Sequence, residues 1–378
     1  MKKLLALLLA GCLSFELAAC GARTEPVETP PKTEAESKAE IIQSIIDDMT
    51  PAEQAGQLLM ADFRKNADGT GMTALSAEAK EAISAYHIGG VILFAENLDT
   101  AEQTKQLTAD LQAAADLPLL IGIDEEGGLV SRLDKSNIPH EPIPAAAEIE
   151  DAAAAGQTIG EELAELGINV DFAPVADVNT NPDNPVIGTR AFSSDPKEAA
   201  EQVGEFIRAM EGTGVSACAK HFPGHGDTAM DSHDGATYVS HDMERLRNVE
   251  FLPFREAIAV DVDFIMAGHI QTPNATTDGL PASLSPELLG ILRQELGFDG
   301  IIITDAMNMG AIVELYGVGE SAVMAVQAGV DIVLMPADLV EAAEALTSAI
   351  ETGKIPKERV EESLTRILSL KYDKGLLV

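Results

Sequence analysis

The chain has 378 residues and a formal net charge of −37, because 62 acidic side chains outnumber 25 basic ones. This excess of negative charge argues against nucleic acid or an anionic membrane surface as a partner. The length suits one large domain or two small ones, with ample material for a core.

The N-terminus has the composition of an export signal. A basic start at residues 1–3 precedes a Leu/Ala-rich run at residues 4–13, which is too short to cross a bilayer as a helix. The segment Leu17-Ala18-Ala19-Cys20 resembles the processing box of bacterial lipoproteins. We therefore expect a signal peptide over residues 1–19 and an acylated Cys20 that anchors an extracytoplasmic protein to the bacterial cell membrane. An ordinary cleaved signal with a chance cysteine is the alternative.

Residues 20–38 are rich in Pro, Glu, Thr and Ala and lack apolar periodicity, so they are expected to form a disordered tether. Cys12 would leave with the signal and Cys20 would carry lipid, which leaves Cys218 alone in the folded part. A disulfide framework is therefore not expected, and Cys218 is predicted to be a small, buried apolar residue. The folded domain is predicted to span residues 39–378.

Short apolar, β-branched runs alternate with helical patterns along the folded part. The expected strands are Gly56–Phe63, Gly89–Phe94, Leu119–Ile123, Asn169–Pro174, Val215–Ala219, Asp263–Ala267, Gly300–Ile303 and Asp331–Leu334. After a helix at Ile41–Met49, the expected helices are Ala77–Tyr86, Ala101–Ala115, Glu148–Leu166, Pro196–Glu211, Asp242–Ala259, Pro286–Leu296, Glu320–Gln327 and Leu339–Glu351. This alternation predicts a (β/α)₈ TIM barrel, with a doubly wound open sheet as the main alternative.

Polar residues at the ends of the expected strands favour the barrel. In a barrel the carboxyl ends of the strands converge on one mouth, whereas an open sheet would spread these residues along an edge. The residues in question are Asp62, Asp124, Asp177, Lys220, His221, His269 and Asp305.

The segment from Ala219 to Gly235 has the highest density of titratable groups, with three of the seven histidines. Its Gly and Pro residues indicate a loop, where functional groups are often placed. Within it, Asp231 lies two positions before His233, a spacing that allows a carboxylate to orient an imidazole. A solvated loop pair is the alternative. Lys220 and His221 could donate hydrogen bonds to a polyol, or Lys220 could pair with a buried aspartate.

Two other segments carry candidate groups. Asp305 directly follows a buried strand, where it could act as a nucleophile or stabilise charge, or merely cap a helix. Asp124 and Arg132 flank the pair Gly127-Gly128, and together they offer an acceptor and a fork of donors for sugar hydroxyls.

The segments Lys220-His221-Phe222-Pro223-Gly224-His225-Gly226 and Asp231-Ser232-His233 together resemble the signature loop of glycoside hydrolase family 3, in particular its single-domain β-N-acetylglucosaminidases. The resemblance covers residue 41 to the C-terminus. Further segments similar to family motifs occur in the expected order, namely Asp124–Gly128, Asn169–Val178, Ile187–Phe192 and Ile303–Met307.

The resemblance implies a role for each matching residue. Asp305 matches the nucleophile of a retaining double displacement, and His233 matches the acid/base, with Asp231 as its orienting partner. The residues that match binding positions for N-acetylglucosamine are Asp124, Arg132, Arg190, Lys220 and His221. Leu129 departs from the arginine that often follows the glycine pair.

A histidine acid suggests a particular substrate class. Most glycosidases use two carboxylates, and a muramic acid next to the scissile bond would bring a lactyl carboxylate that repels a glutamate. The expected substrates are therefore N-acetylglucosaminides from peptidoglycan, including muropeptides. The two-domain β-glucosidases of the family take a glutamate acid from a second domain. No such domain is expected after the barrel here, which makes a β-glucosidase the less favoured interpretation.

Four alternatives to a β-N-acetylglucosaminidase remain open. They are a β-glucosidase, a phosphorylase that transfers the sugar to phosphate, a sugar-binding lipoprotein without activity, and a metal-dependent hydrolase. The last would draw its ligands from His221, His225, Asp231, His233 and His269. We expect no cofactor or metal, no nucleic acid, a carbohydrate as the partner, membrane contact through a lipid anchor only, and a monomer.

Overall fold

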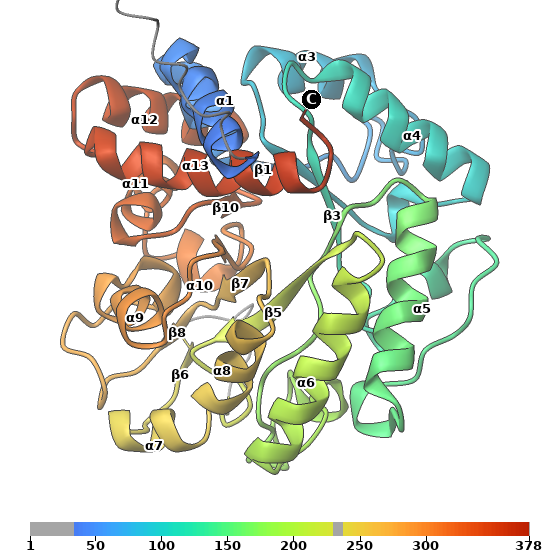
Figure 1. The fold of residues 1–378 in the computed structure, drawn as a ribbon, viewed down its shortest axis with the longest axis vertical. Coiled ribbons are helices and arrows are strands. Elements are labelled where there is room, and N and C mark those ends of the chain that lie inside the picture. The colour runs from blue at the N-terminus through green and yellow to red at the C-terminus, as the bar shows by residue number, and fades with distance from the viewer. Residues whose placement is uncertain (1–33, 230–236, 378) are drawn as a thin grey trace, which may run out of the picture.

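The computed structural model describes residues 34–229 and 237–377. Its main sheet holds eight parallel strands in the order β10-β1-β2-β3-β4-β5-β7-β9, and a bridge between Ile303 and Ile332 joins the two outer strands. The sheet is therefore a nearly closed barrel surrounded by helices (Figure 1). Its strands are β1 (Leu59–Asp62), β2 (Gly90–Leu93), β3 (Leu120–Ile123), β4 (Val170–Asp171), β5 (Ser216–Phe222), β7 (Phe264–Ala267), β9 (Ile301–Thr304) and β10 (Val333–Leu334).

All eight expected strands overlap observed ones, so the predicted barrel is confirmed. The first strand begins later than expected, because Gly56 and Gln57 belong to α2 (Pro51–Gln57). Thr50 begins that helix with a capping box, in which its hydroxyl accepts from the Glu53 amide while its own amide donates to the Glu53 carboxylate.

The helices also follow the expected order. They are α1 (Glu34–Asp48), α3 (Ala77–Ala85), α4 (Ala101–Ala114), α5 (Ala152–Glu165), α6 (Pro196–Glu211), α7 (Met243–Asn248), α8 (Phe251–Ala259), α9 (Pro286–Gly290), α10 (Gly310–Val313), α11 (Val318–Ala328), α12 (Leu339–Glu351) and α13 (Lys357–Asp373). The expected helix Asp242–Ala259 is divided into α7 and α8, and α9 continues as a π-helix over Ile291–Glu295. The pattern did not predict α13 or the small parallel pair β6 (Thr237–Tyr238) and β8 (Ile270–Gln271).

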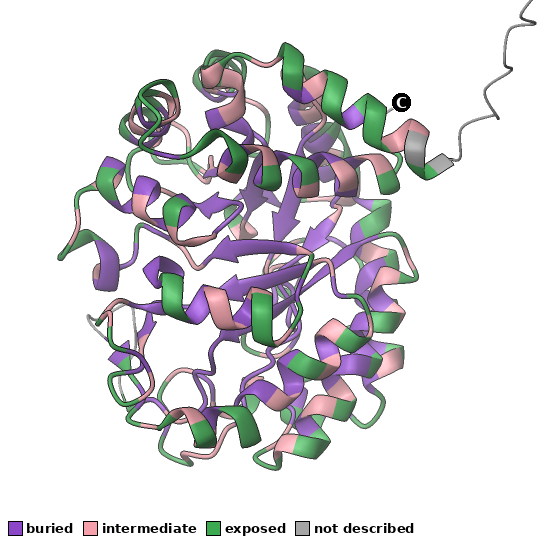
Figure 2. Cartoon of the chain, turned by 60° about the vertical axis from the view of Figure 1, so that its left-hand side comes forward, coloured by how far each residue is buried: buried purple, intermediate pink, exposed green. Residues whose placement is uncertain are grey.

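Burial explains why the strand segments are so apolar. The strands are buried between the barrel interior and the surrounding helices, whose exposed residues face outward (Figure 2). A parallel sheet covered on both faces requires continuous apolar strands. The polar residues that interrupt these runs therefore cluster at the strand ends.

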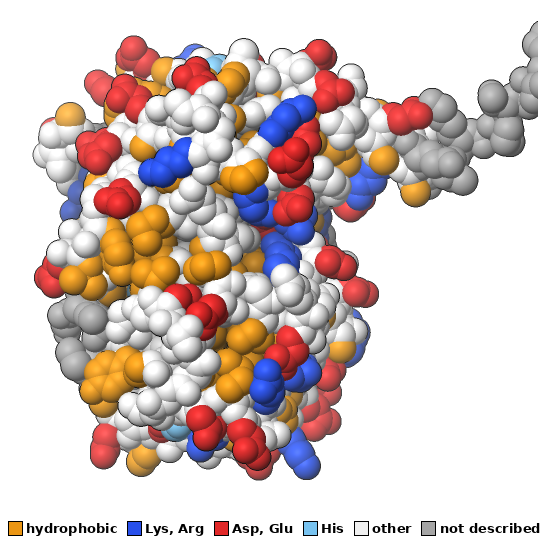
Figure 3. Space-filling view, turned by 90° about the vertical axis from the view of Figure 1, so that its left-hand side faces the viewer, with side chains coloured by type: hydrophobic (Ala, Val, Ile, Leu, Met, Phe, Trp, Pro, Cys, Tyr) orange, Lys and Arg blue, Asp and Glu red, His pale blue; other side chains and the backbone are white. Residues whose placement is uncertain are grey.

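Helix α1 begins at Glu34, five residues before the predicted start of the folded domain at residue 39. It packs against α13, and Lys38 forms an ion pair of 2.5 Å with Asp373. Across the described part of the chain, no helix combines the length and apolar character needed to cross a membrane. On the face shown in Figure 3, acidic side chains are spread over the surface, with hydrophobic groups between them.

Candidate active site

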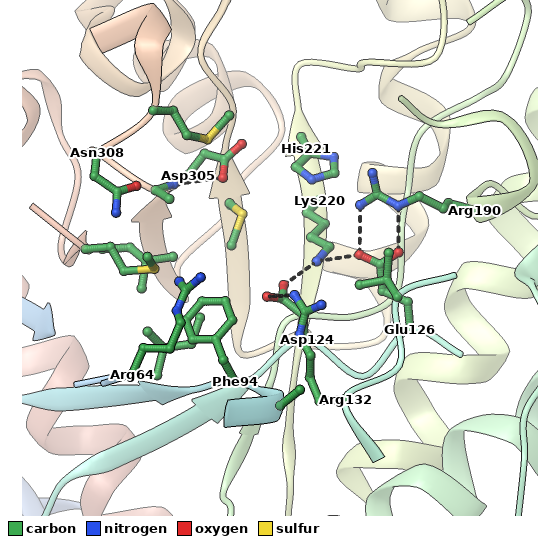
Figure 4. A pocket seen from close by; sticks show the side chains of 18 of the residues that line it. Arg64, Phe94, Asp124, Glu126, Arg132, Arg190, Lys220, His221, Asp305 and Asn308 are labelled. Carbon is green, nitrogen blue, oxygen red and sulfur yellow. Dashed lines mark hydrogen bonds and ion pairs between the residues drawn. The ribbon is translucent and has the colours of Figure 1, made fainter. Parts of the chain in front are cut away.

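A cavity of about 730 Å³ opens at the carboxyl ends of the barrel strands. Its wall includes residues from the strand ends around the barrel and from the loops that follow them (Figure 4). Six of the candidate residues line it: Asp124, Arg132, Arg190, Lys220, His221 and Asp305. The fold thus brings into one cavity side chains that are far apart in sequence, as expected for a barrel mouth.

Lys220 lies at the centre of a charge network on one wall of the cavity. Its amine is 2.8 Å from the Asp124 carboxylate and 2.7 Å from that of Glu126. Arg190 holds the second carboxylate with two hydrogen bonds of 2.8 Å, and Arg132 contacts Asp124 at 3.0 Å. These contacts are drawn as dashed lines in Figure 4. The alternation of cations and carboxylates fixes donors and acceptors at the wall before a substrate binds.

Electrostatics keep this network ionised. Burial alone would raise the pKa of Asp124, but the nearby Lys220 and Arg132 outweigh it and lower the pKa. The pKa of Glu126 falls to about 2 because Lys220 and Arg190 outweigh burial in the same way. The pKa of Lys220 rises, since Asp124 and Glu126 outweigh its burial. The charges of Asp124, Glu126 and Lys220 therefore persist at neutral pH.

Asp305 directly follows β9, and its amide donates to the Ala267 carbonyl of the neighbouring strand at 2.9 Å. One carboxylate oxygen accepts from the Ala306 amide at 2.8 Å. Burial raises its pKa, but the combined attraction of His221 and His269 and the Ala306 hydrogen bond lower it overall. The cavity is thus lined by a rigidly held, ionised carboxylate, the form that a nucleophile requires.

His221 is positioned by Asp177, which follows β4. Its ring Nδ1 is 2.8 Å from one Asp177 oxygen, and the other Asp177 oxygen accepts from the His221 amide at 3.2 Å. A ring held in this way keeps its Nε2 for another contact. The peptide bond between Lys220 and His221 is cis.

Several lining residues had no predicted role. Glu126 completes the Lys220 network, and Arg64 places its guanidinium carbon 3.4 Å from the centre of the Phe94 ring, with Arg132 at 5.3 Å. Each had a weak sequence signal, because Glu126 lies in the Gly127-Gly128 segment, Arg64 directly follows an expected strand and Phe94 is the last residue of another. What the sequence did not show is that these three loops meet.

The expected acid/base pair, Asp231 and His233, lies outside the described residues, as does Cys20. The histidines proposed for metal binding can be examined in part. His269 uses both ring nitrogens within the protein, with contacts of 2.8 Å to Ser283 and 2.9 Å to the Ala306 carbonyl. Within residues 34–229 and 237–377, no three His, Cys, Asp or Glu side chains are grouped so that they could hold a metal ion.

A family profile described as "Glycosyl hydrolase family 3 N terminal domain" matches residues 50–370. The chain is also similar to curated proteins. It is 38% identical over 366 residues to "Beta-hexosaminidase A" of Pseudoalteromonas piscicida, covering 85% of this chain and 61% of that protein. It is 33% identical over 341 residues to "Beta-hexosaminidase LpqI" of Mycobacterium tuberculosis, covering 85% of this chain and 83% of that protein.

Among solved structures, the barrel resembles a glycoside hydrolase family 3 β-N-acetylglucosaminidase from Paenibacillus sp.. The TM-score is 0.81 at 42% identity, with 87% of this chain and 63% of the other covered. The chain thus spans less than two thirds of the length of this neighbour and of the Pseudoalteromonas protein.

Proposed function

Because the chain belongs to glycoside hydrolase family 3, we propose that it is a retaining β-N-acetylglucosaminidase that releases terminal N-acetylglucosamine from β-linked sugars. The observation that carries this proposal is the ionised Asp305 carboxylate at the wall of a cavity that also presents Lys220, Asp124 and Arg190. Relatives named β-hexosaminidase support the choice of sugar.

The proposed reaction has two steps. Asp305 attacks the anomeric carbon and the bond to the leaving oxygen breaks, while His233, oriented by Asp231, gives that oxygen a proton. His233 then takes a proton from water, the water oxygen attacks the anomeric carbon, and the bond to Asp305 breaks. The sugar is released with its original configuration, as in other retaining glycosidases. Asp124, Arg132, Arg190, Lys220 and His221 would hold the sugar hydroxyls and the acetamido group.

The role of His233 as acid has its own test. His233→Ala should lower kcat/KM for an N-acetylglucosamine disaccharide by about 10²–10⁴-fold, because a poor leaving group needs protonation. For an aryl N-acetylglucosaminide with a strongly acidic phenol as leaving group, kcat/KM should fall much less. Equal losses in kcat/KM on both substrates would contradict the assignment.

We further propose muropeptides as the natural substrate class. A histidine acid tolerates an anionic neighbour better than a glutamate does, and the cavity wall includes Arg64, Arg132 and Lys135. These cations would favour a carboxylate on the sugar that leaves. Anchoring through Cys20 would place the enzyme outside the cytoplasm, and Cys20→Ser should then release the protein from membranes into the soluble fraction.

The decisive experiment compares an aryl β-N-acetylglucosaminide with an aryl β-glucoside. A clear preference for the acetamido sugar is expected, and a preference for glucose would overturn the assignment in favour of a β-glucosidase. Loss of turnover after exhaustive chelation, restored by metal, would favour a metal-dependent hydrolase, and turnover of neither sugar would favour a binding protein.

Transfer to phosphate is the second candidate reaction, because a histidine acid/base also suits an anionic acceptor. Adding inorganic phosphate to the assay separates the two reactions. Free N-acetylglucosamine at an unchanged rate indicates hydrolysis, and a sugar 1-phosphate formed at a higher rate indicates phosphorolysis.

A further inference from the structure

His225 lines the catalytic cavity but has no part in the reaction described above. It is only 2% exposed, and its backbone is held on both sides. Its amide donates to Asp177 at 2.6 Å, and its carbonyl accepts from the Asn184 side chain at 2.9 Å. The following Gly226 packs so closely that a Cβ there would lie 1.9 Å from the Val178 carbonyl oxygen. The ring therefore has a fixed position in the wall.

Its hydrogen bonds determine which ring nitrogen carries the proton. Nδ1 lies 2.6 Å from the Thr228 hydroxyl oxygen. That hydroxyl already donates its one proton to the His225 carbonyl, at 2.9 Å. Both contacts are hydrogen bonds only if Nδ1 donates to Thr228 while Thr228 donates to the carbonyl, so we assign the ring hydrogen to Nδ1 and the lone pair to Nε2.

This lone pair is buried and has no hydrogen-bond partner among the residues that the structure describes. Burial, followed by repulsion from His221, lowers the pKa of His225 despite the attraction of Asp177 and Asp305, so the ring is neutral near neutral pH. A buried acceptor without a donor is costly, and most buried polar groups in native proteins are hydrogen-bonded.

The other acceptors on this wall differ from His225. Asp124 and Glu126 are charged and already share Lys220, and each also holds an arginine. His225 offers a neutral acceptor beside these pairs, and Asp305 is close enough to affect its pKa. Such a nitrogen suits a donor on the sugar near the reacting carbon.

We propose that Nε2 of His225 is a substrate-binding acceptor, which receives a hydrogen bond from an N–H or O–H group of the sugar held in the cavity. This inference rests on the proposed glycosidase function and adds a residue to its binding site. Thr228 is then a positioning residue, because it selects the tautomer that presents the lone pair.

Two substitutions separate binding from a structural role. His225→Asn keeps an N–H donor near the position of Nδ1, so it can still bond Thr228, but it loses the acceptor at Nε2. His225→Gln places a carboxamide near Nε2 and loses the donor toward Thr228. We expect kcat/KM to fall about tenfold in the Asn variant and to stay within about threefold in the Gln variant. Thermal unfolding of both variants shows whether they fold.

The test compares the loss of kcat/KM in the Asn variant with the loss in the Gln variant. A larger loss in the Gln variant, equal losses in both, or no loss in either would overturn the proposal. Assays on aryl N-acetylglucosaminide and aryl glucoside then identify the donor. A loss confined to the first substrate indicates the acetamido N–H, and a loss on both indicates a ring hydroxyl. If the wild type turns over neither substrate, the proposed function fails instead, and calorimetric binding of N-acetylglucosamine to the same variants tests His225 independently.

Discussion

Two buried charge clusters lie at opposite ends of the barrel. At the carboxyl ends of the strands, Lys220 joins Asp124 and Glu126. Before β10, at the amino end, Asp331 is surrounded by Arg293, Arg359 and Arg366. Both clusters consist of charges removed from water, so burial alone does not identify the functional one.

The clusters differ in how fully their atoms are used. Both oxygens of Asp331 accept hydrogen bonds: Ser363 donates to one at 2.7 Å, and the Ile302 amide donates to the other at 2.9 Å. In the cluster at the carboxyl ends of the strands, the Nε atoms of Arg132 and of the adjacent Arg64 have no hydrogen-bond partner among the described residues. Both side chains line the large cavity. Satisfied charges hold elements together, whereas partly satisfied charges at a cavity wall await a ligand.

The largest expected effect tests the carboxyl end of the barrel. Asp305→Ala should lower kcat by at least about 10³-fold, because it removes the proposed nucleophile. The melting temperature should stay near that of the wild type, since Asp305 contributes few hydrogen bonds to the fold. Added azide, which can attack the anomeric carbon in place of the carboxylate, should restore part of the turnover on an activated aryl substrate. Retained activity without azide would remove Asp305 from the mechanism.

At the amino end of the barrel, a substitution is expected to lower stability and to leave kcat unchanged. Asp331→Asn leaves three arginines around an uncharged group and should lower the free energy of unfolding by about 3–5 kcal/mol. The kcat of the folded fraction should not change. Urea unfolding, together with kcat per active molecule, measures both effects. Asp48→Asn, an exposed substitution at the end of α1, is the matched control and should alter stability by less than about 0.5 kcal/mol. A loss of kcat in Asp331→Asn would break the distinction between the two ends.

These two clusters also show what could be predicted from sequence. The strands were predictable because a sheet buried on both faces requires continuous apolar runs, and polar residues directly after these runs had to lie at the mouth. Asp124, Lys220, His221 and Asp305 could therefore be assigned to one site before the fold was known.

Pairings across the chain could not be predicted in this way. Asp331 was assigned to the eighth strand, but nothing local indicates that Arg293, Arg359 and Arg366 converge on it, and α13 itself was not expected. Glu126 stands two residues after Asp124, yet its ion pair with Lys220 depends on the register of β3 with β4 and of β4 with β5. Distances between strand ends, rather than motifs, supply this information.

Lys371 offers a smaller effect that depends on pH. It is fully buried at the amino end, where it donates to Gln57 at 2.7 Å and to the Gly89 carbonyl at 3.1 Å. Burial lowers its pKa from 10.5 to about 7. Between these values the unfolded chain binds more protons, so this lysine makes the free energy of unfolding rise with pH.

Lys371→Met removes this pH dependence. From pH 7 to 10.5 the wild type should gain roughly 2–4 kcal/mol relative to the variant, measured by urea unfolding at each pH. Lys357→Met, at the exposed start of the same helix, should show no comparable difference. Parallel pH profiles for the wild type and Lys371→Met would mean that Lys371 stays charged in the folded state.

The smallest effect is expected at Leu129, the position at which the resemblance to the family led us to expect an arginine. Leu129 follows the glycine pair and is 75% exposed, so its side chain adds little to the core. Leu129→Arg should change the free energy of unfolding by less than about 0.5 kcal/mol. An added cation near Arg132 could improve binding of an anionic leaving group, but a solvent-exposed charge contributes only about 0.2–1 kcal/mol. The KM for a muropeptide should therefore fall by no more than about fivefold, while that for a neutral aryl sugar stays unchanged. An equal fall for both substrates would show that the loop contacts the sugar held beside Asp305 rather than the leaving group.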